Sequence, residues 1–374
     1  MILRYYNDLS KILPGNKVLI IYGPRRVGKT TLINLLLDHS SLKYKIDSGD
    51  NIRVRNVITS EDFQLIKEYA EGYELIVIDE AQNIPGIGQG LKIMSDQNPG
   101  LKIIATGSSS FNIKQDIGEP LTGRKKEIIL FPLSQMELNA YYNRYELKEQ
   151  LSNFLIFGSY PEIFTTSNTN DKIELIQELV NSYLLKDILG FERLKSPRQL
   201  IDLLKLLAFQ IGHEVSVNEL AAQVGLNVRT IARYIDLLEK GFVIYRLGAF
   251  SKNLRKEITK KSKYYFYDNG VRNGIVMQFN SLDMRNDTGQ LWENFLMSER
   301  LKYLHYKRIF ANRYFWRTYQ QQELDYLEEI NGKLYAYEYK YNKKRVKIPA
   351  EFQKVYKVEE FYTINRNNYL DFVM

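Results

Sequence analysis

The sequence predicts an α/β fold for residues 1–140, built on a parallel sheet, with helical and mixed domains after it. A complete phosphate-loop pattern, Gly-x-x-x-x-Gly-Lys-Thr, occupies residues 23–30 between an apolar run at 17–22 and an amphipathic run at 31–37. Four more short apolar runs follow, separated by helical or loop sequence, at residues 44–47, 75–79, 102–106 and 127–130. Such alternation of buried strands with helices is typical of a parallel sheet that is covered on both faces.

The phosphate loop predicts a binding site for a nucleoside triphosphate with Mg²⁺. Its residues are Gly23, Pro24, Arg25, Arg26, Val27, Gly28, Lys29 and Thr30, with Thr31 next to them at the start of the predicted helix. The glycines let backbone amides point at phosphate oxygens, and the helix start adds its positive end. Lys29 can reach the β- and γ-phosphates, and the Thr30 hydroxyl can ligate the metal ion.

Polar residues follow or precede the predicted strands, and ligands of such sheets bind at the carboxyl ends of the strands. Asp79 is expected to hold Mg²⁺ and Glu80 to polarise the attacking water, unless both are solvated acids at a strand end. The hydroxyls of Thr106 and Ser108 either contact the γ-phosphate or satisfy their own turn. Arg124 is either an arginine finger, in cis or from a neighbouring subunit, or a surface charge.

Composition narrows the class of protein. At 374 residues the chain is expected to hold about two to four domains. No apolar stretch approaches the roughly 18 residues of a membrane span, and the first residues show no export signal. The lack of cysteine excludes disulfides and thiolate zinc sites and fits a cytoplasmic protein. A formal charge of +8 either favours contact with a polyanion or simply aids solubility.

The middle of the chain predicts a helical lid and then a winged helix-turn-helix. Residues 141–195 show helical periodicity with one break at 158–161. Residues 216–235 then have capping-box spacing at their start and a turn glycine, Gly225, between two helical runs. A strand-like run at 242–246 follows and is expected to begin the β wing.

Contact with DNA is a separate hypothesis about this winged helix. Arg229, Thr230 and Arg233 lie on the polar side of the second helix, where they can reach phosphates or bases. A basic run opposed only by Glu257 follows the first wing strand: Lys252, Arg255, Lys256, Lys260, Lys261 and Lys263. The alternative is a module that packs between domains, with the basic run as a solvated loop.

The C-terminal region contains a second group of chemistry-bearing residues. Glu293 lies in an amphipathic helical run, while Asp325, Glu338 and Lys340 lie in two alternating runs joined by a strong hairpin signal at 331–332. Period-two geometry puts Glu338 and Lys340 on one face, and the hairpin can bring Asp325 alongside. Two carboxylates can hold Mg²⁺, and a lysine can orient the attacking water.

The motifs of the first domain resemble those of the AAA-type ATPases of a broad prokaryotic family. The matching segments are Gly-Pro-Arg-Arg-Val-Gly-Lys-Thr-Thr-Leu at 23–32, Ile-Asp-Glu-Ala-Gln-Asn-Ile-Pro at 78–85, Ala-Thr-Gly-Ser-Ser-Ser at 105–110 and Leu-Thr-Gly-Arg at 121–124. Two further signatures are similar at 157–162, where Ser159 replaces a usual second glycine, and at 183–188. The resemblance implies ATP binding and hydrolysis, with a helical lid, a winged helix and a C-terminal domain of unknown function 4143.

The C-terminal residues resemble the restriction-endonuclease-like nucleases of the PD-(D/E)xK class. Asp325 matches the aspartate, Glu338-Tyr339-Lys340 the E-x-K element and Glu293 the helix carboxylate, whereas Leu324 replaces the usual proline. A basic run, Lys340, Lys343, Lys344, Arg345 and Lys347, is where a nucleic-acid phosphate can approach, or it is plain surface. The alternative is that Asp325, Glu338 and Lys340 are cross-strand ion pairs.

The resulting expectation is an ATPase core at 1–140, a lid at 141–195, a winged helix at 196–268 and an α+β nuclease-like domain at 269–374. The leading hypothesis is a Mg²⁺-dependent ATPase that acts on nucleic acid and gates this last domain. One alternative is a nucleotide-dependent switch for a protein partner, with an inert C-terminal domain. Another is a transcription regulator, and any of the three can be a homo-oligomer.

Overall fold

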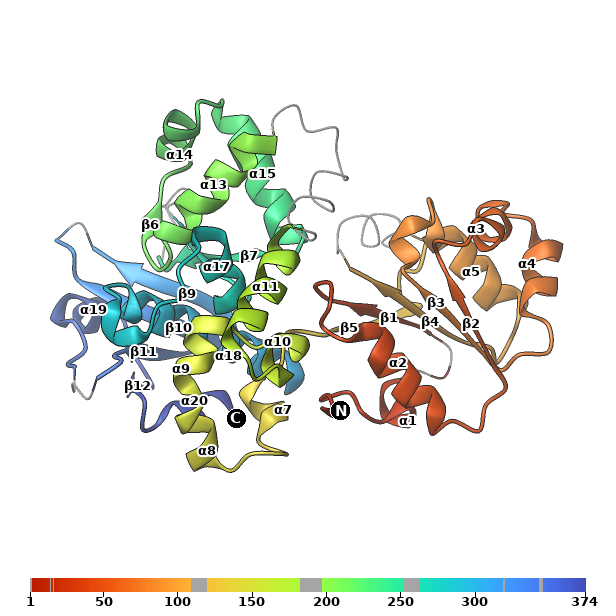
Figure 1. Ribbon diagram of the computed structural model, residues 1–374, viewed down its shortest axis with the longest axis horizontal. Helices are drawn as coiled ribbons and strands as arrows, with labels where there is room; N and C mark the ends of the chain where they lie inside the picture. The colour runs from red at the N-terminus through yellow and green to blue at the C-terminus, as the bar shows by residue number, and fades with distance from the viewer. Residues whose placement is uncertain are drawn as a thin grey trace. The chain divides into compact units, whose positions relative to one another are not determined.

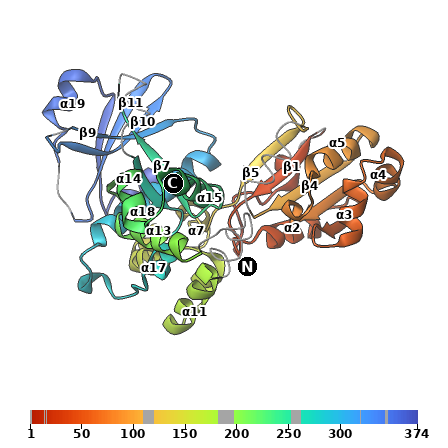
Figure 2. The same ribbon diagram turned by 90° about the horizontal axis from the view of Figure 1, so that it is seen from above.

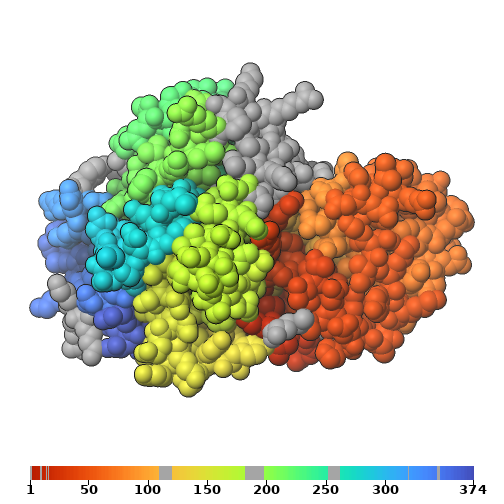
Figure 3. All heavy atoms as spheres, in the orientation of Figure 1, coloured from red at the N-terminus to blue at the C-terminus, as the bar shows by residue number. Residues whose placement is uncertain are grey.

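The computed structural model describes residues 2–13, 15, 17–108, 120–181, 197–251, 262–318, 320–342 and 346–374. The chain divides into two compact units. The first is Met1–Pro132 with Lys240–Phe242, and the second is Leu133–Glu239 with Val243–Met374. In the space-filling view, red and orange mark the first unit, while yellow, green and blue mark the second (Figure 3).

The first unit is built on a five-stranded parallel sheet, as predicted. Its strands are β1 (Val18–Tyr22), β2 (Tyr44–Ser48), β3 (Leu75–Asp79), β4 (Lys102–Gly107) and β5 (Lys125–Ile129). Their order is β2-β3-β4-β1-β5, with every neighbouring pair parallel. β1 is therefore flanked by β4 and β5, so the loop after β1 emerges beside the end of β4.

Helices cover both faces of this sheet. They are α1 (Leu9–Ile12), α2 (Lys29–Asp38), α3 (Ile52–Thr59), α4 (Phe63–Ala70), the 3-10 turn η1 (Ala81–Asn83) and α5 (Ile87–Gln97). Figure 1 shows α2 on one face and α3, α4 and α5 together on the other. The residues of β1 are all buried, which explains why its sequence is an unbroken apolar run rather than an alternating one.

The second unit starts with short helices. They are α7 (Gln135–Leu138), α8 (Arg144–Glu149), α9 (Leu151–Phe157), α10 (Pro161–Thr165) and α11 (Thr169–Leu179). The predicted break lies between α9 and α10, where Gly158 has a φ of 76° and a Cβ would lie 1.9 Å from the Asp268 carboxylate. Later helices are α13 (Pro197–Phe209), α14 (Val217–Val224), α15 (Val228–Lys240), α17 (Asn269–Val276), α18 (Thr288–Tyr306), α19 (Ala350–Val355) and α20 (Tyr369–Val373), with a 3-10 turn, η3 (Leu282–Met284).

One seven-stranded sheet runs through this unit. Its strands are β6 (Glu214–Val215), β7 (Ile244–Ala249), β8 (Ser262–Phe266), β9 (Asn312–Arg317), β10 (Glu323–Ile330), β11 (Lys333–Tyr339) and β12 (Glu360–Ile364). The order is β12-β11-β10-β9-β7-β8-β6, and β7 pairs with β9 in parallel. Strands on either side of residue 268 therefore share a single sheet, which Figure 2 shows from above.

The hairpin between β10 and β11 forms as its sequence predicts. Ile330 pairs with Lys333, and the two residues between them, Asn331 and Gly332, have φ values of 51° and 76°. Positive φ at both central positions is the geometry that favours Asn-Gly in a two-residue turn. This turn sets the register that places Asp325 near Glu338.

Helices α14 and α15 form the predicted pair joined by a tight turn. Gly225 ends α14 with a φ of 72°, and the Asn227 side chain accepts from the Thr230 amide at 2.8 Å. The buried face of α15 is Ile231, Tyr234, Ile235, Leu237 and Leu238. Val228, the first residue of this helix, is apolar but 45% exposed.

Several predicted features fall outside the described residues. They are the signature at 183–188, the basic residues Lys252, Arg255, Lys256, Lys260 and Lys261, and Lys343, Lys344 and Arg345. Within the described part of the chain, no helix is both long and apolar enough to cross a bilayer.

Candidate functional sites

The phosphate loop joins the end of β1 to α2, and its two glycines are required for different reasons. Gly23 passes so close to β5 that a Cβ would lie 2.2 Å from the Leu130 carbonyl oxygen. A Cβ at Gly28 would make only ordinary contacts, with Thr31 and Arg4, but the φ of 90° disfavours any side chain there. The loop thus curls tightly before the helix begins.

The first turn of α2 is arranged to receive an anion. Gly28 is its N-cap and supplies no side-chain hydrogen bond to the leading amides, and the N-terminal end of a helix favours an anion. Lys29 is only 6% exposed, and its Nζ donates to the carbonyl oxygens of Gly23 at 3.0 Å and Pro24 at 2.8 Å. These contacts hold the ammonium over the loop, where triphosphate oxygens are expected.

Asp79 connects the phosphate loop to the neighbouring strand ends. The Thr30 hydroxyl donates to Asp79 Oδ2 at 2.7 Å, and the Thr106 hydroxyl donates to Asp79 Oδ1. The Glu80 amide donates to the same Oδ1 at 3.1 Å. Thr30, Glu80 and Thr106, three predicted residues from three separate segments, therefore all donate to the Asp79 carboxylate. A hydroxyl and a carboxylate in contact fit the water-rich coordination of Mg²⁺.

Glu80 and Ser108 are linked through Gln82, which was not among the predicted site residues. Gln82 donates from Nε2 to the Glu80 carboxylate and accepts from the Ser108 amide at 3.3 Å. Glu80 itself has a φ of 51°, so the chain turns sharply directly after β3. Gln82 lies within the motif at 78–85, and this position next to Asp79 and Glu80 could have identified it as a site residue.

Arg4 is a second residue at this site that local sequence patterns do not indicate. Its guanidinium donates to the Val27 carbonyl in the phosphate loop and to the Phe131 carbonyl after β5, both at 2.5 Å. Arg4 is 6% exposed. It ties the loop to the last strand, but its partners are 23 and 127 residues away, so no local pattern could have revealed them.

The structure does not bring Arg124 to the phosphate loop. Its carbonyl accepts from the Val18 amide at 2.8 Å, at the start of β1, whereas the loop follows Tyr22 at the end of that strand. Its guanidinium forms an ion pair with Asp96 on the surface. The hypothesis of an arginine finger acting in cis is therefore wrong, because Arg124 lies at the opposite edge of the sheet.

In the second unit, the hairpin brings together the three residues predicted from β10 and β11. Lys340 Nζ lies 2.8 Å from Glu338 Oε2 and 3.6 Å from Asp325 Oδ2. The Tyr339 amide donates to Asp325 Oδ2 at 2.8 Å, which fixes that carboxylate. Lys340 stays 37% exposed, while Glu338 is 5% exposed. The ammonium can therefore reach solvent and the carboxylates together.

Glu293 joins this group from α18, through a lysine predicted to have another role. Lys263 of β8 is 1% exposed, and its Nζ lies 3.3 Å from Glu293 Oε1 and pairs with Glu323. The Tyr265 hydroxyl donates to Glu293 Oε1 at 2.6 Å. The expectation that Lys263 faces nucleic acid is therefore wrong, since two carboxylates hold its charge inside the fold.

Burial and mutual repulsion shift the pKa values of these acids. Burial, and then the nearby Asp325 carboxylate, raise the pKa of Glu338 to about 7. Burial also raises the pKa of Glu293 to about 7, with Lys263 acting against the shift and Asp325 adding to it. For Lys263, burial favours the neutral form, but Glu293 and Glu323 outweigh it and keep the pKa above the ordinary lysine value.

The acids of this site fit a divalent ion only in part. Among the described residues, no group of three or more histidine or acidic side chains is placed to hold a metal ion. Asp325 and Glu338 alone offer hard carboxylate oxygens, and Mg²⁺ commonly binds one or two carboxylates while keeping several waters. For a metal ion to bind there, the Lys340 ammonium would have to move away from one or both carboxylates.

On α15, Arg229 and Arg233 are exposed one turn apart. Thr230, the third residue predicted to reach DNA, instead directs its hydroxyl to Asn227 Oδ1 at 3.0 Å. The same Asn227 oxygen accepts from the Thr230 amide and thereby caps the helix. Of the three predicted residues, Arg229 and Arg233 are therefore the ones whose side chains lie exposed on the polar face of this helix.

Three family models match the chain. Residues 15–139 match a model described as an AAA domain, and residues 148–282 match a domain of unknown function, DUF8612. Residues 288–370 match a second domain of unknown function, DUF4143. The phosphate loop and Asp79 lie in the first match, and Glu293, Asp325, Glu338 and Lys340 in the last.

Relatives are similar over most of the chain. A protein of Mycobacterium tuberculosis described as uncharacterized is 25% identical over 336 residues, 89% of this chain and 72% of that protein. An uncharacterized protein of Methanocaldococcus jannaschii is 25% identical over 308 residues, 77% of this chain and 67% of that protein.

The solved structures that resemble this chain do so with low sequence identity and low TM-scores. A signal transduction ATPase with numerous domains and a tetratricopeptide repeat sensor, from Pyrococcus horikoshii, is 15% identical with a TM-score of 0.30. The match covers 79% of this chain and 44% of that one. The Holliday junction branch migration motor RuvB of Thermotoga maritima is 16% identical with a TM-score of 0.34. That match covers 64% of this chain and 87% of the RuvB chain. The family matches, in agreement with the loop and sheet described above, assign residues 15–139 to an AAA domain and residues 288–370 to a DUF4143 domain.

Proposed function

We propose that the protein binds ATP with Mg²⁺ and hydrolyses it, and that it engages nucleic acid. The observation that carries the ATPase part is the contact of Thr30 and Thr106 with Asp79 beside the phosphate loop. Strand ends that converge on one carboxylate next to the start of a helix are suited to a metal-bound triphosphate.

The residues have separate tasks in this proposal. The α2 amides and Lys29 hold the phosphates, while Thr30 and Asp79 hold the metal ion, which neutralises charge on the phosphate oxygens. Glu80 orients the attacking water and takes its proton, and Gln82 keeps the Glu80 carboxylate in place. Thr106 and Ser108 report the presence of the γ-phosphate to β4.

A pair of variants tests the ATPase proposal. Lys29→Ala should abolish nucleotide binding or nearly so, because it removes the charge over the loop. Glu80→Gln should keep binding and lose hydrolysis, since the amide retains the shape but cannot accept a proton. Binding is measured with a fluorescent ATP analogue and hydrolysis by phosphate release. Full ATP affinity in Lys29→Ala would refute the site.

The nucleic-acid part rests on the helix pair α14–α15 with strands β6, β7 and β8, which supports a winged helix. Arg229 and Arg233 on α15 are suited to phosphates. Duplex binding should weaken with salt, and the Arg229→Ala/Arg233→Ala double variant should show a shallower salt dependence. Arg53→Ala, an exposed arginine on α3 of the first unit, is the control. No detectable duplex binding at low salt would favour the alternative of a nucleotide-dependent switch that binds a protein partner.

Cleavage of nucleic acid is a second candidate function. The cluster of Asp325, Glu338 and Lys340 favours this function. In this proposal Mg²⁺ binds to the carboxylates of Asp325 and Glu338. Plasmid incubated with Mg²⁺ and ATP should be nicked by the wild type but not by Glu338→Ala. Glu359→Ala, an exposed acid near the same sheet, should nick like the wild type. Intact plasmid under every nucleotide condition would leave the C-terminal domain as the inert partner of the switch alternative.

A further inference from the structure

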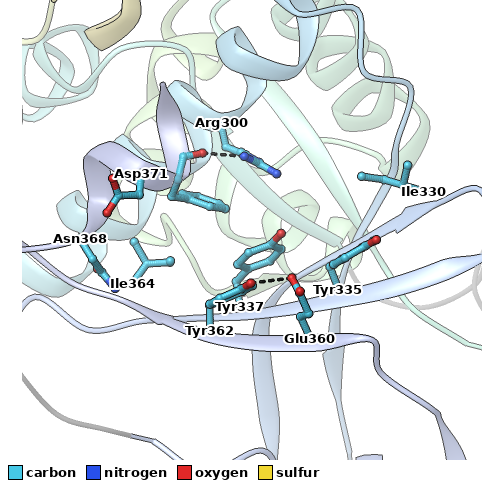
Figure 4. Close-up of a pocket in the computed structure, with 10 residues that line it drawn as sticks. Arg300, Ile330, Tyr335, Tyr337, Glu360, Tyr362, Ile364, Asn368 and Asp371 are labelled. Atoms are coloured by element: carbon cyan, nitrogen blue, oxygen red, sulfur yellow. Dashed lines mark hydrogen bonds between the residues drawn. The ribbon is translucent and has the colours of Figure 1, made fainter.

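A cleft of about 440 Å³ lies in the second unit between the sheet and two helices (Figure 4). Tyr335 and Tyr337 of β11 and Tyr362 of β12 form the sheet side. Arg300 of α18 and the end of α20 form the other side. Cavities of this size are typical of small-ligand sites, and three aromatic rings give it flat apolar walls.

The positive charge inside this cleft is already neutralised. Arg300 donates from Nε and Nη2 to the two Glu328 oxygens, each at 2.7 Å, and from Nη1 to the Phe372 carbonyl at 2.6 Å. Its guanidinium carbon lies 4.5 Å from the Phe372 ring centre and 5.8 Å from that of Tyr337. The resident arginine is thus held by a carboxylate and by aromatic faces.

Glu360 offers a second carboxylate in the same cleft, and the nearby Lys333 forms its ion pair with Glu359 instead. It accepts from the Tyr362 hydroxyl at 2.5 Å, and in the part of the chain that the structure describes no lysine or arginine forms an ion pair with it. Asp371, the other acid of the lining, is paired with Arg144. The net charge left among the lining residues is therefore the negative charge of Glu360.

We propose that this cleft binds a guanidinium group, held in plane by Glu360 and stacked on Tyr335 or Tyr362. The chain shows the same recognition next to it, where Arg300 is bound by Glu328 and aromatic rings. A planar guanidinium matches a carboxylate with two hydrogen bonds and stacks on aromatic faces, which an ammonium does less well. Cation–aromatic attraction adds to the pair.

The cleft is separate from the nuclease-like cluster. Side chains alternate along β11, so Tyr335 and Tyr337 point to the opposite face of the strand from Glu338 and Lys340. The proposal therefore stands whether or not the C-terminal domain cleaves nucleic acid. It assigns a ligand class to a site that the ATPase and nuclease proposals do not use.

Titration of the full chain with N-acetyl-arginine amide tests the proposal, with N-acetyl-citrulline amide as the neutral ligand of the same shape. We expect the arginine compound to bind with a Kd on the order of 1 mM, measured by ligand-observed NMR. Glu360→Gln should weaken binding about tenfold, and Glu359→Gln, whose acid is paired with Lys333 at 2.9 Å, should not. Both positions are exposed, so folding should be retained, which tryptophan fluorescence checks.

Two probes separate the sources of the guanidinium. Tighter binding of a capped Gly-Gly-Arg-Gly-Gly peptide than of agmatine would assign the group to a polypeptide, and the reverse would assign it to a small molecule. Either result supports the site. Equal binding of the arginine and citrulline compounds, or unchanged binding in Glu360→Gln, would overturn the proposal.

Discussion

Thr30 donates a hydrogen bond of 2.7 Å to Asp79, so the phosphate loop and the acid at the end of β3 are in direct contact. The two residues are 49 positions apart, and parallel pairing of β1, β4 and β3 brings their strand ends to one edge. Both side chains are expected around the metal ion of a bound triphosphate. The contact therefore defines where the metal should enter.

Replacing Thr30 by valine should weaken nucleotide binding only when Mg²⁺ is present. Valine keeps the branched shape but removes the hydroxyl that donates to Asp79 and ligates the metal. We expect a loss of about tenfold in affinity with Mg²⁺, or about 1.4 kcal/mol, and little change in EDTA. Titration with a fluorescent ATP analogue measures both. Thr59→Val on α3 is the control, and equal losses with and without metal would contradict the assigned role.

Replacing Gln82 by leucine should slow ATP hydrolysis while leaving ATP binding intact. The change removes the amide that connects the Glu80 carboxylate to the Ser108 backbone. General-base catalysis typically accelerates a reaction by roughly 10²–10⁴-fold, and a loosely held Glu80 carboxylate would lose part of this acceleration. We therefore expect kcat to fall about tenfold. Phosphate release at saturating ATP measures it, with Gln64→Leu on α4 as the control. A normal kcat would show that Gln82 only shapes the turn.

Local patterns were sufficient for much of the fold and of both sites. The parallel sheet, the break after Phe157 and the Asn331–Gly332 turn follow from apolar runs and backbone preferences over a few residues. The convergence of Asp79 with Thr30, and of Asp325 with Glu338, follows once strands are placed. Most of these inferences need only one element or two that adjoin, whereas the contact of Thr30 with Asp79 also needs β4 between β1 and β3.

Residues whose partners lie far along the chain were missed or misassigned. Arg4 resembles a surface arginine until β5 returns beside the loop, 127 residues later. Lys263 belongs to a basic run by composition, yet the strand alternation of β8 turns it inward toward Glu293 and Glu323. The parallel pairing of β7 with β9, which joins two expected domains in one sheet, also has no local signal.

Replacing Lys263 by methionine should destabilise the second unit without affecting ATP binding. It leaves Glu293 and Glu323 without their shared cation, and breaking a buried ion pair costs about 3–5 kcal/mol. The two tryptophans of the chain, Trp292 and Trp316, both lie in this unit, so their fluorescence in urea reports its unfolding. Lys333→Met removes a surface pair and should leave the midpoint unchanged. An unchanged midpoint in Lys263→Met, with weaker duplex binding, would restore its role as a nucleic-acid contact.

Replacing Glu338 by glutamine should stabilise the second unit at high pH and change it little at pH 5. The pKa of Glu338 is raised from 4.5 to about 7 by burial and by Asp325, so the folded state binds a proton that the unfolded state releases between these values. The free energy of unfolding of the wild type should therefore fall as pH rises from about 4.5 to 7 and then level off. Glutamine stays neutral, so the variant should exceed the wild type at pH 8 by on the order of 1–3 kcal/mol. Urea titrations in EDTA, followed by tryptophan fluorescence at several pH values, give this difference; a constant difference across pH would mean that Glu338 is already charged at pH 5.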